Sequence, residues 1–354
     1  MMKNLLFIPV ALLFFLAAAV FPALAGTSIT FTSAVPGLTV DTTDLEKKVQ
    51  DLIEANGGFL SDAFFLSNIT GYPIGKSHIG AFPHFQIGVA NGVGCTNMAY
   101  FARSKDERND GSFPMMVPNP VLHFGFGLTE RTDFIGKFFM FTSGMYKPEA
   151  SNSMVRVNEF NIYSAGGRFR YNIVQRTTVL PMVFSFGGIT LGMGGDVMMG
   201  SVKADGRYRA SYKSVNVTYG AFNQDVNLSL DSRYNADVNW AVYSATAQAL
   251  AYFDFFYLFS FYTGMGLTGG YGIFNTTFTA NGTLTSDVAI PLLGTTVGTM
   301  TMNSTNKYKP YPVAPTYILG LEINLLMLKL NLETMVNMRN GSDVTALVGT
   351  RMEF

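Results

Sequence analysis

Apolar and polar side chains alternate along most of the chain from about residue 77 onward. Between Leu122 and Leu128, for example, every second residue is Leu or Phe, and His or Gly stands between them. Successive side chains of a β-strand point to opposite faces, so a period of two predicts strands with one apolar face. Similar stretches lie at 133–146, 158–173, 181–193, 238–255, 257–272 and 316–338.

Clusters of turn-forming residues separate these stretches, at 104–110, 149–153, 303–309 and 340–342. Alternating segments of about 10 residues between turn signals are typical of a transmembrane β-barrel, and at roughly 20–24 residues per strand the chain predicts about 12–14 antiparallel strands. The polar, less regular residues 203–233 and 286–315 are either strand extensions or long outer loops. The expected fold class is therefore an all-β transmembrane barrel with a short helical N-terminal segment.

The chain ends on a strand pattern whose last residue is aromatic. The strand before it places Lys329, Asn331 and Glu333 on the inward face, because a Lys or Arg on the lipid face costs about 2–4 kcal/mol near the bilayer midplane. A three-residue turn at 340–342 sets Lys329 opposite Glu353 and Asn331 opposite Arg351. One apolar face of the last strand then holds Val344, Ala346, Val348, Thr350, Met352 and Phe354.

Two apolar hexapeptides, 253–258 and 323–328, resemble each other in pattern. In the second, the alternation changes parity across Leu326-Met327, as a two-residue hairpin requires. Leu and Met are poor residues for such a turn, so a long bent strand is the alternative to a tight periplasmic turn.

A helical stripe precedes the first strand. Thr43 and Glu46 form a capping box, and Gly57-Gly58 supplies a stop. Residues 26–75 are therefore predicted to form a helical segment that plugs the barrel or lies at its periplasmic mouth, with the barrel over 76–354; a loosely ordered leader is the alternative. The residues of the stripe are Leu45, Val49, Leu52 and Ile53.

The first 25 residues have the pattern of a secretory signal peptide. Lys3 precedes an apolar run over 5–20, and Ala23-Leu24-Ala25 is an A-x-A cleavage site. We therefore expect export, cleavage and insertion into the cell outer membrane. A single cysteine, Cys95, allows no internal disulfide framework.

Composition supports a membrane-facing surface and argues against nucleic acid. Charged residues make up 14% of the chain, whereas soluble domains have roughly 25%. The formal net charge is zero, so no nucleic-acid partner is expected. The expected partner of this apolar surface is outer-membrane lipid.

The candidate functional residues are polar side chains of the predicted barrel lumen. Arg168 and Arg170 share one strand face, where they line a path for anions or pair with acidic residues. The three histidines are too scattered for a metal site, no cofactor is expected, and no nucleophile has a recognisable signature, so an enzyme is not expected. The full set of lumen-facing candidates is Arg168, Arg170, Lys329, Asn331, Glu333, Arg351 and Glu353.

A terminal strand of alternating apolar residues that ends in Phe354 resembles the assembly signal of bacterial outer-membrane barrels. With the helical leader and the strand number, the chain is similar to the long-chain fatty-acid transporter type, which has an N-terminal hatch, although its leader lacks the Asn-Pro-Ala type motif. It also resembles uncharacterised spirochaete outer-membrane proteins. The likeness implies the barrel assembly machinery and a small hydrophobic ligand as partners, and passive uptake of small, hydrophobic compounds as the function. A structural or adhesive surface barrel that acts through its outer loops is the alternative, and a soluble β-rich exported protein is a third.

Overall fold

The structure is a computed structural model. It describes residues 25–40, 58, 60–72, 75–99, 112–143, 155–290, 294–310, 312–339, 341 and 343–354.

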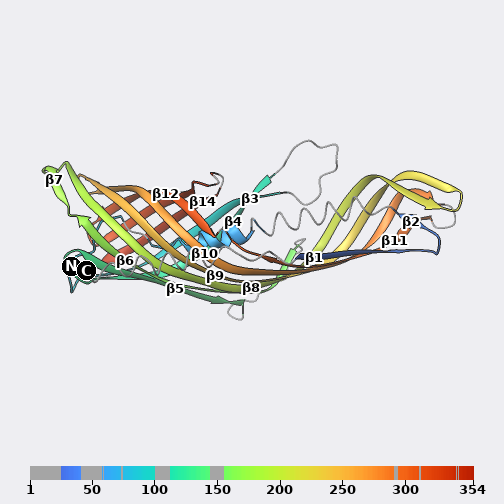
Figure 1. The fold of residues 1–354 in the computed structure, drawn as a ribbon, viewed down its shortest axis with the longest axis horizontal. Coiled ribbons are helices and arrows are strands. Elements are labelled where there is room, and N and C mark those ends of the chain that lie inside the picture. Colours follow the sequence, from blue (N-terminus) through green and yellow to red (C-terminus); the bar gives the residue numbers. More distant parts are fainter. Residues whose placement is uncertain are drawn as a thin grey trace.

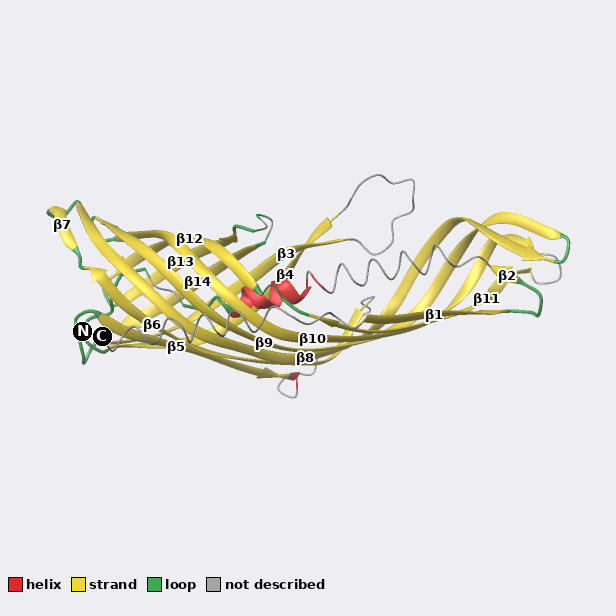
Figure 2. Cartoon of the chain, viewed as in Figure 1, coloured by secondary structure: helices red, strands yellow, loops and turns green. Residues whose placement is uncertain are grey.

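One antiparallel sheet and one short helix make up these residues (Figures 1 and 2). The helix covers residues 60–68. The 14 strands of the described part are β1 (Ala25–Ser33), β2 (Thr39–Val40), β3 (Phe85–Ala99), β4 (Ser112–Gly127), β5 (Thr132–Thr142), β6 (Val155–Val174), β7 (Thr177–Leu180), β8 (Phe184–Tyr219), β9 (Phe222–Phe255), β10 (Phe259–Ile290), β11 (Gly294–Tyr308), β12 (Val313–Leu325), β13 (Leu328–Asn337) and β14 (Val344–Glu353).

Ten of the strands close into a ring. Its order is β3, β4, β5, β6, β8, β9, β10, β12, β13 and β14, and β14 then pairs with β3. At the closure, the N–H of Phe354 donates to the Phe85 carbonyl at 2.9 Å, and the Phe85 N–H donates to the Phe354 carbonyl at 3.1 Å. The phenyl rings of Phe85 and Phe354 stack, with 4.9 Å between their centroids. The predicted all-β antiparallel barrel with a short helical segment is confirmed.

Three strands run far beyond the ring. β8, β9 and β10 have 36, 34 and 32 residues, whereas a strand needs only about 9–11 residues to cross a bilayer. β10 pairs with β12 over its first third and with β11 beyond it, while β1 joins β11 and β2 joins β8. This projecting sheet lies at the right of Figure 1. Residues 203–233 and 286–315 are thus mainly strand extensions, and the turn expected at 303–309 is wrong because β11 runs to Tyr308.

The opposite end of the barrel, which we call the turn end, has tight apolar turns. Leu325 pairs with Leu328, so Leu326 and Met327 form a two-residue hairpin turn. Leu326 has φ 56°, and Phe256 and Tyr257 in the turn between β9 and β10 have φ 53° and 55°. A left-handed conformation costs a residue with a side chain roughly 1–2 kcal/mol. Both hexapeptides are therefore hairpins, and neither is a bent strand.

The predicted register of the last hairpin is wrong by two residues. Lys329 lies opposite Arg351 rather than Glu353, and Asn331 opposite Gly349. The Asn337 N–H donates to the Asp343 carbonyl, and Met338 and Arg339 lie outside the ladder, so the loop is longer than three residues. A shift of two keeps every side chain on its expected face, because the side-chain period of a strand is two.

The outer surface of the ring is apolar, whereas its inner surface carries most of the buried polar and charged side chains together with an apolar cluster around the helix. On β13, Leu332 is 50% exposed while the adjacent Asn331 is 1% exposed. This is the reverse of a soluble protein. Exposed apolar side chains of the ring include Ile87, Val89, Leu122, Phe124, Phe138, Phe169, Leu191, Phe261, Leu267, Leu319, Leu330 and Val348.

The N-terminal segment is only partly helical. The expectation of a helical segment is wrong for β1 and β2, where β-branched and aromatic residues such as Thr30 and Phe31 favour a strand. The stripe Leu45, Val49, Leu52 and Ile53, and residues 1–24 of the predicted signal peptide, lie outside the described residues. Among the described residues, no helix is long and apolar enough to cross a membrane.

A pair of engineered cysteines tests the register of β13 and β14. In a Cys95→Ser background, Leu332→Cys with Val348→Cys should form a disulfide readily, because directly opposite Cβ atoms lie about 4.5–5.5 Å apart. Leu332→Cys with Thr350→Cys, which are opposite in the predicted register, should oxidise slowly. Non-reducing gel mobility measures both, and faster oxidation of the second pair would contradict the register.

Candidate functional site: a barrel closed from within

Residues 60–72 and 75–80, which we call the lumen segment, lie inside the ring (Figure 2). Every residue from 61 to 72 is buried. Phe64 of the helix packs against Trp240 of β9 and Phe274 of β10, with ring centroids 4.3 and 5.0 Å away. The helix thus joins the wall in one hydrophobic cluster.

Glycines in the wall make room for the lumen segment. A Cβ on Gly94 of β3 would lie 2.6 Å from the Ser67 nitrogen, and one on Gly92 would collide with the Thr70 side chain. A Cβ on Gly270 of β10 would likewise collide with the ring of Phe65. Glycine inside a strand often marks a close approach of another chain segment, and here the approaching segment is the chain's own N-terminal part.

Lys137 of β5 is the most enclosed anchor of the lumen segment. Its Nζ donates to the Asn68 carbonyl and, at 2.5 Å, to the Thr70 carbonyl. It also lies 2.8 Å from Asp196 of β8, which accepts a 2.5 Å hydrogen bond from the Tyr72 hydroxyl. Both members of this ion pair are buried, so each charge depends on the other and on the polar groups of the segment.

Arg168 and Arg170 also hold the lumen segment. Arg168 donates to Gln248 at 2.8 Å, and its guanidinium lies 4.2 Å from the centroid of the Tyr72 ring. Arg170 makes two bonds to Asp133, at 2.7 and 2.6 Å, and a third at 2.8 Å to the Lys76 carbonyl. Arg170 therefore pairs with an acidic residue, whereas the described partners of Arg168 are an amide oxygen, a backbone carbonyl and an aromatic ring.

The C-terminal strand anchors the segment at the turn end. Arg351 pairs with Glu322 of β12 at 2.9 Å, and Glu322 accepts the Gly75 N–H at 3.1 Å. Glu353 forms an ion pair with Lys76. Lys76 lies in the lumen and outside the strands; burial, with the positive charge of Arg351 added, lowers its pKa to about 7. The positive charge of Lys76 in this ion pair is therefore lost as the pH rises through about 7.

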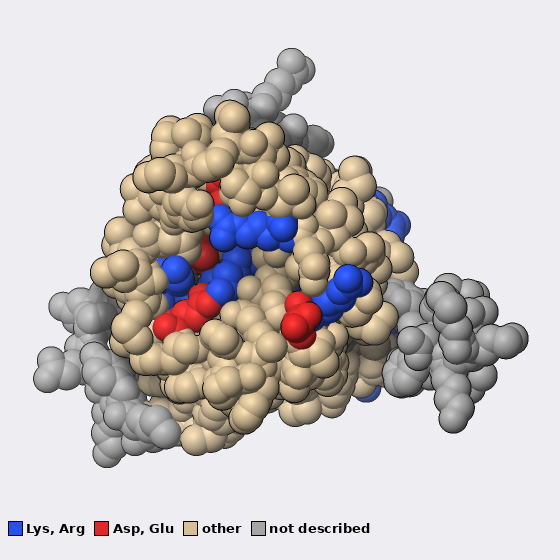
Figure 3. Space-filling view, turned by 90° about the vertical axis from the view of Figure 1, so that its left-hand side faces the viewer, with Lys and Arg blue, Asp and Glu red and all other residues tan. Residues whose placement is uncertain are grey.

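The remaining three candidates do not hold the segment directly. The Tyr262 hydroxyl donates a hydrogen bond that the Glu333 carboxylate accepts at 2.8 Å and the Asn331 side-chain oxygen shares at 3.3 Å. Lys329 lines a polar cavity of about 570 Å³ at the turn end, near the Arg176–Asp254 ion pair of 3.1 Å. Figure 3 looks onto this end, where basic and acidic side chains gather in a central hollow. Within the described ranges, no group of three His, Cys, Asp or Glu side chains could hold a metal ion.

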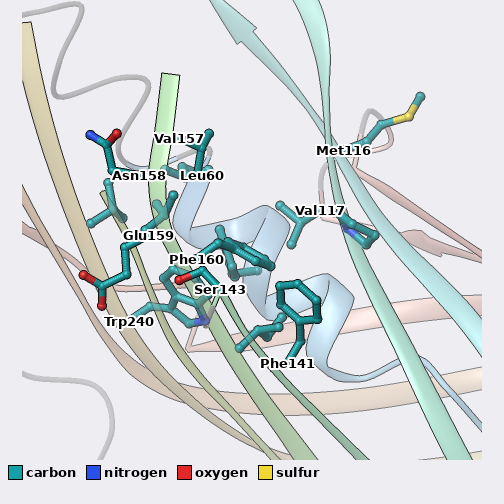
Figure 4. Close-up of a pocket in the computed structure, with 15 residues that line it drawn as sticks. Leu60, Met116, Val117, Phe141, Ser143, Val157, Asn158, Glu159, Phe160 and Trp240 are labelled. Atoms are coloured by element: carbon teal, nitrogen blue, oxygen red, sulfur yellow. The ribbon is translucent and has the colours of Figure 1, made fainter. Parts of the chain in front are cut away.

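A second cavity, of about 550 Å³, lies beside the helix and is apolar (Figure 4). Leu60 and Phe64 line it from the helix, and Phe141, Phe160 and Trp240 from the wall. The buried indole N–H of Trp240 has no acceptor in the part of the chain that the structure describes. The walls of the cavity are therefore mainly apolar.

Sequence reasoning missed this cavity and most of the anchors' partners. Asp133 and Lys137 are four residues apart on β5, so both side chains point into the barrel. Because a buried charge is costly unless it is paired, this spacing could have predicted that both residues have charged partners in the lumen. The partners Asp196 and Glu322 come from strands far away in the sequence. Only closure of the ring brings them to the same lumen.

A comparison with protein-family models matches residues 38–354 to the Lsa36-like family. The chain belongs to this family. A comparison with curated proteins finds no match.

Several solved structures have a similar course. The translocator domain of the autotransporter NalP from Neisseria meningitidis is 10% identical, with 90% of this chain and all of that chain covered and a TM-score of 0.27. The toluene transporter TodX from Pseudomonas putida is 9% identical, with 77% and 90% covered and a TM-score of 0.22. The outer-membrane protease OmpT from Escherichia coli is 7% identical, with 82% and 100% covered and a TM-score of 0.22. TM-scores this low carry no argument about this chain.

Replacing Lys137 tests whether the ion pair holds the lumen segment. Lys137→Met leaves Asp196 buried without its cation, and breaking a buried pair costs about 3–5 kcal/mol. Amide hydrogen exchange over 67–72, followed by mass spectrometry, should accelerate strongly. The control is Lys203→Met, which removes an exposed pair with Glu159 and should leave this exchange unchanged. Equal exchange in both variants would contradict the anchoring role.

Proposed function

We propose that the chain is an outer-membrane barrel whose turn end faces the periplasm and whose projecting sheet lies outside the cell. The apolar outer face of a closed antiparallel ring supports this, because a membrane-spanning strand must pair its backbone on both sides. Short turns at one end and long extensions at the other match the usual orientation of such barrels.

We further propose that the barrel takes up small hydrophobic compounds. The observation that carries this is the apolar cavity between the helix and the wall, because its volume lies in the range of small-molecule sites. A purely structural barrel has no need of such a cavity.

The lumen segment lies between the two cavities: Leu60 and Phe64 line the apolar one, and residues 76–80 line the polar one at the turn end. Its anchors are hydrogen bonds and ion pairs to β5, β6, β8, β12 and β14. Uptake then requires the segment to move, and the apolar cavity and the polar cavity lie on its two sides as entry and exit.

Tethering the segment to the wall tests this proposal. Asn68 donates to Ser244 of β9 at 3.1 Å, so Asn68→Cys with Ser244→Cys, in a Cys95→Ser background, can be joined by oxidation or by a short dithiol-bridging reagent. We expect cells with the joined protein in the outer membrane to lose uptake of an apolar fluorescent dye, and a reductant to restore it after oxidation.

The matched control is Leu332→Cys with Val348→Cys, a tether within the wall that should leave dye uptake unchanged. The same uptake rate before and after joining Asn68→Cys to Ser244→Cys would show that the segment does not gate the passage. No uptake by the untethered protein would overturn the uptake function itself.

A second candidate function is adhesion through the projecting sheet. It is favoured by the length of β8, β9 and β10, whose outer parts exceed what a membrane crossing needs. These parts carry exposed charges such as Arg209 and Asp231, which pair at 3.1 Å. In this function the sheet presents a surface to host or matrix partners.

Shortening the β8–β9 hairpin separates the two functions. Tyr212 lies opposite Leu228, so residues 213–227 can be replaced by Asn-Gly, which suits a two-residue hairpin turn. We expect the shortened protein to keep its heat-modifiable gel migration and its dye uptake, and to lose binding to surfaces coated with matrix proteins. Undiminished binding would contradict adhesion through this hairpin.

A further inference from the structure

The first described strands of the chain belong to the projecting sheet and not to the ring. β1 pairs with β11 along its whole length, from Ala25↔Asn306 to Ser33↔Gly298, and β2 pairs with β8 at two positions. Figure 1 shows β1, β2 and β11 together, away from the turn end. We call residues 25–40 the N-terminal strap.

The strap connects the two edges of the projecting sheet. Its other strands follow the order β11, β10, β9 and β8, so that β11 and β8 are the edge strands. β6 is the ring partner of β8, and among the described residues its pairing ends at Gly206. Further out, β2 pairs with the same edge at Val217 and Thr218. Residues 34–38 alone separate β1 on one edge from β2 on the other.

Apolar side chains of the strap complete a core inside the projecting sheet. Leu38 is 5% exposed, and Phe31, Val35 and Val40 pack against the same cluster. Because both edge strands contribute to this cluster, the sheet is curled and the strap closes it. Its buried members are Leu38, Val217 of β8, Val226, Leu228 and Leu230 of β9, Ala280, Leu284 and Ile290 of β10, and Val297, Met300 and Met302 of β11.

The lumen segment runs lengthwise through the ring, from the turn end toward the projecting sheet. Asn68 donates to Ser244 of β9, and Phe64 packs on Trp240, which lies further along β9 from the turn end at Phe255. The chain therefore moves away from the turn end as its residue numbers fall. β3, the first strand of the ring, begins at the turn end. The strap and the start of β3 thus lie on opposite sides of the ring.

This route sets the strap apart from the rest of the projecting sheet. β8, β9 and β10 continue from strands of the ring, and β11 lies between β10 and the ring strand β12 in the chain. The strap instead leads to the ring through the lumen segment. With the membrane placement proposed above, the strap lies outside the cell, while β3 starts on the periplasmic side.

We propose that the barrel exports its own N-terminal strap, which crosses the outer membrane through the lumen and then closes the projecting sheet outside the cell. The inference rests on the proposed outer-membrane placement. The strap contains no Asp, Glu, Lys or Arg, so its passage takes no charge out of water. Its partner is the chain's own sheet, whose two edges supply unpaired backbone groups. Burial of Leu38 favours the exported position.

An epitope tag in the strap tests the export. Pro36 and Gly37 are exposed between β1 and β2, so a short tag is inserted between them in the full-length protein. We expect an antibody against the tag to label intact cells. The matched control carries the same tag between Gly220 and Ala221, in the exposed turn between β8 and β9. It should be labelled to the same extent, because that turn belongs to the same projecting sheet.

The two tags distinguish this inference from the membrane placement on which it rests. Labelling at the β8–β9 turn but not in the strap would overturn the export and leave the placement intact. Labelling of neither tag in protein with heat-modifiable migration would overturn both. If the tagged strap prevents that migration, Pro36→Cys and Ala221→Cys, each in a Cys95→Ser background, replace the tags. A membrane-impermeant maleimide then labels intact cells, with the same outcomes.

Passage through the lumen is tested in the labelled molecules themselves. The tagged strap is combined with Asn68→Cys, Ser244→Cys and Cys95→Ser, and protein is captured by antibody from the surface of intact, oxidised cells. We expect a disulfide in most captured molecules, because Asn68 contacts Ser244 inside the ring while the tag lies outside. Captured protein without the disulfide, although Leu332→Cys with Val348→Cys oxidises under the same conditions, would show that the strap reaches the surface by another route.

Closure of the projecting sheet is tested by a charge in its core. Leu38→Asp places a carboxylate in the cluster, whereas Thr39→Asp places one on the exposed side of the strap. Protease added to intact cells should cleave the projecting sheet several-fold faster in the first variant, and heat-modifiable migration should be kept in both. Equal cleavage rates would show that the strap does not close the sheet.

Discussion

The pairing of β14 with β3 is the constraint on which the rest of the molecule depends. It runs from Val344↔Cys95 to Glu353↔Gln86 and is completed by the reciprocal bonds of Phe354 and Phe85. Without it, two strands of an apolar-faced sheet would present unpaired N–H and C=O groups to lipid, where each costs several kcal/mol. Closure also creates the lumen, and so the place where inward charges of distant strands meet.

Ion pairs lie in the interior that closure creates, and their carboxylates also accept hydrogen bonds from backbone N–H groups of the lumen segment. Asp133 accepts from Arg170 and from the Ile79 N–H, and Glu322 accepts from Arg351 and from the Gly75 N–H. Buried ion pairs add little net stability, but losing one partner is expensive. The arrangement therefore stabilises this position of the segment, and each carboxylate also has an arginine partner that belongs to a strand and not to the segment.

The fold could be predicted from the sequence because a period of two shows which face of each strand is apolar, as at Leu332 beside Asn331. The register of β13 and β14 could not, because Asn340-Gly341-Ser342 fits a short turn and nothing local shows that Met338 and Arg339 also leave the ladder. The lumen contacts could not either, since they join residues far apart in the chain. The glycines at 92 and 94 did carry information, as sites of close approach rather than of bending.

The uninterrupted course of β8 and β9 has a mechanical consequence. Each runs as one strand from the tip of the projecting sheet to the turn end, and they share a ladder from Tyr219↔Phe222 to Phe184↔Phe255 with only two local irregularities. On the way, β8 carries Asp196 and β9 carries Ser244, which contact the lumen segment. The projection therefore continues the barrel wall as one sheet, and a displacement of its tip is transmitted through the ladder to the strands that contact the lumen segment.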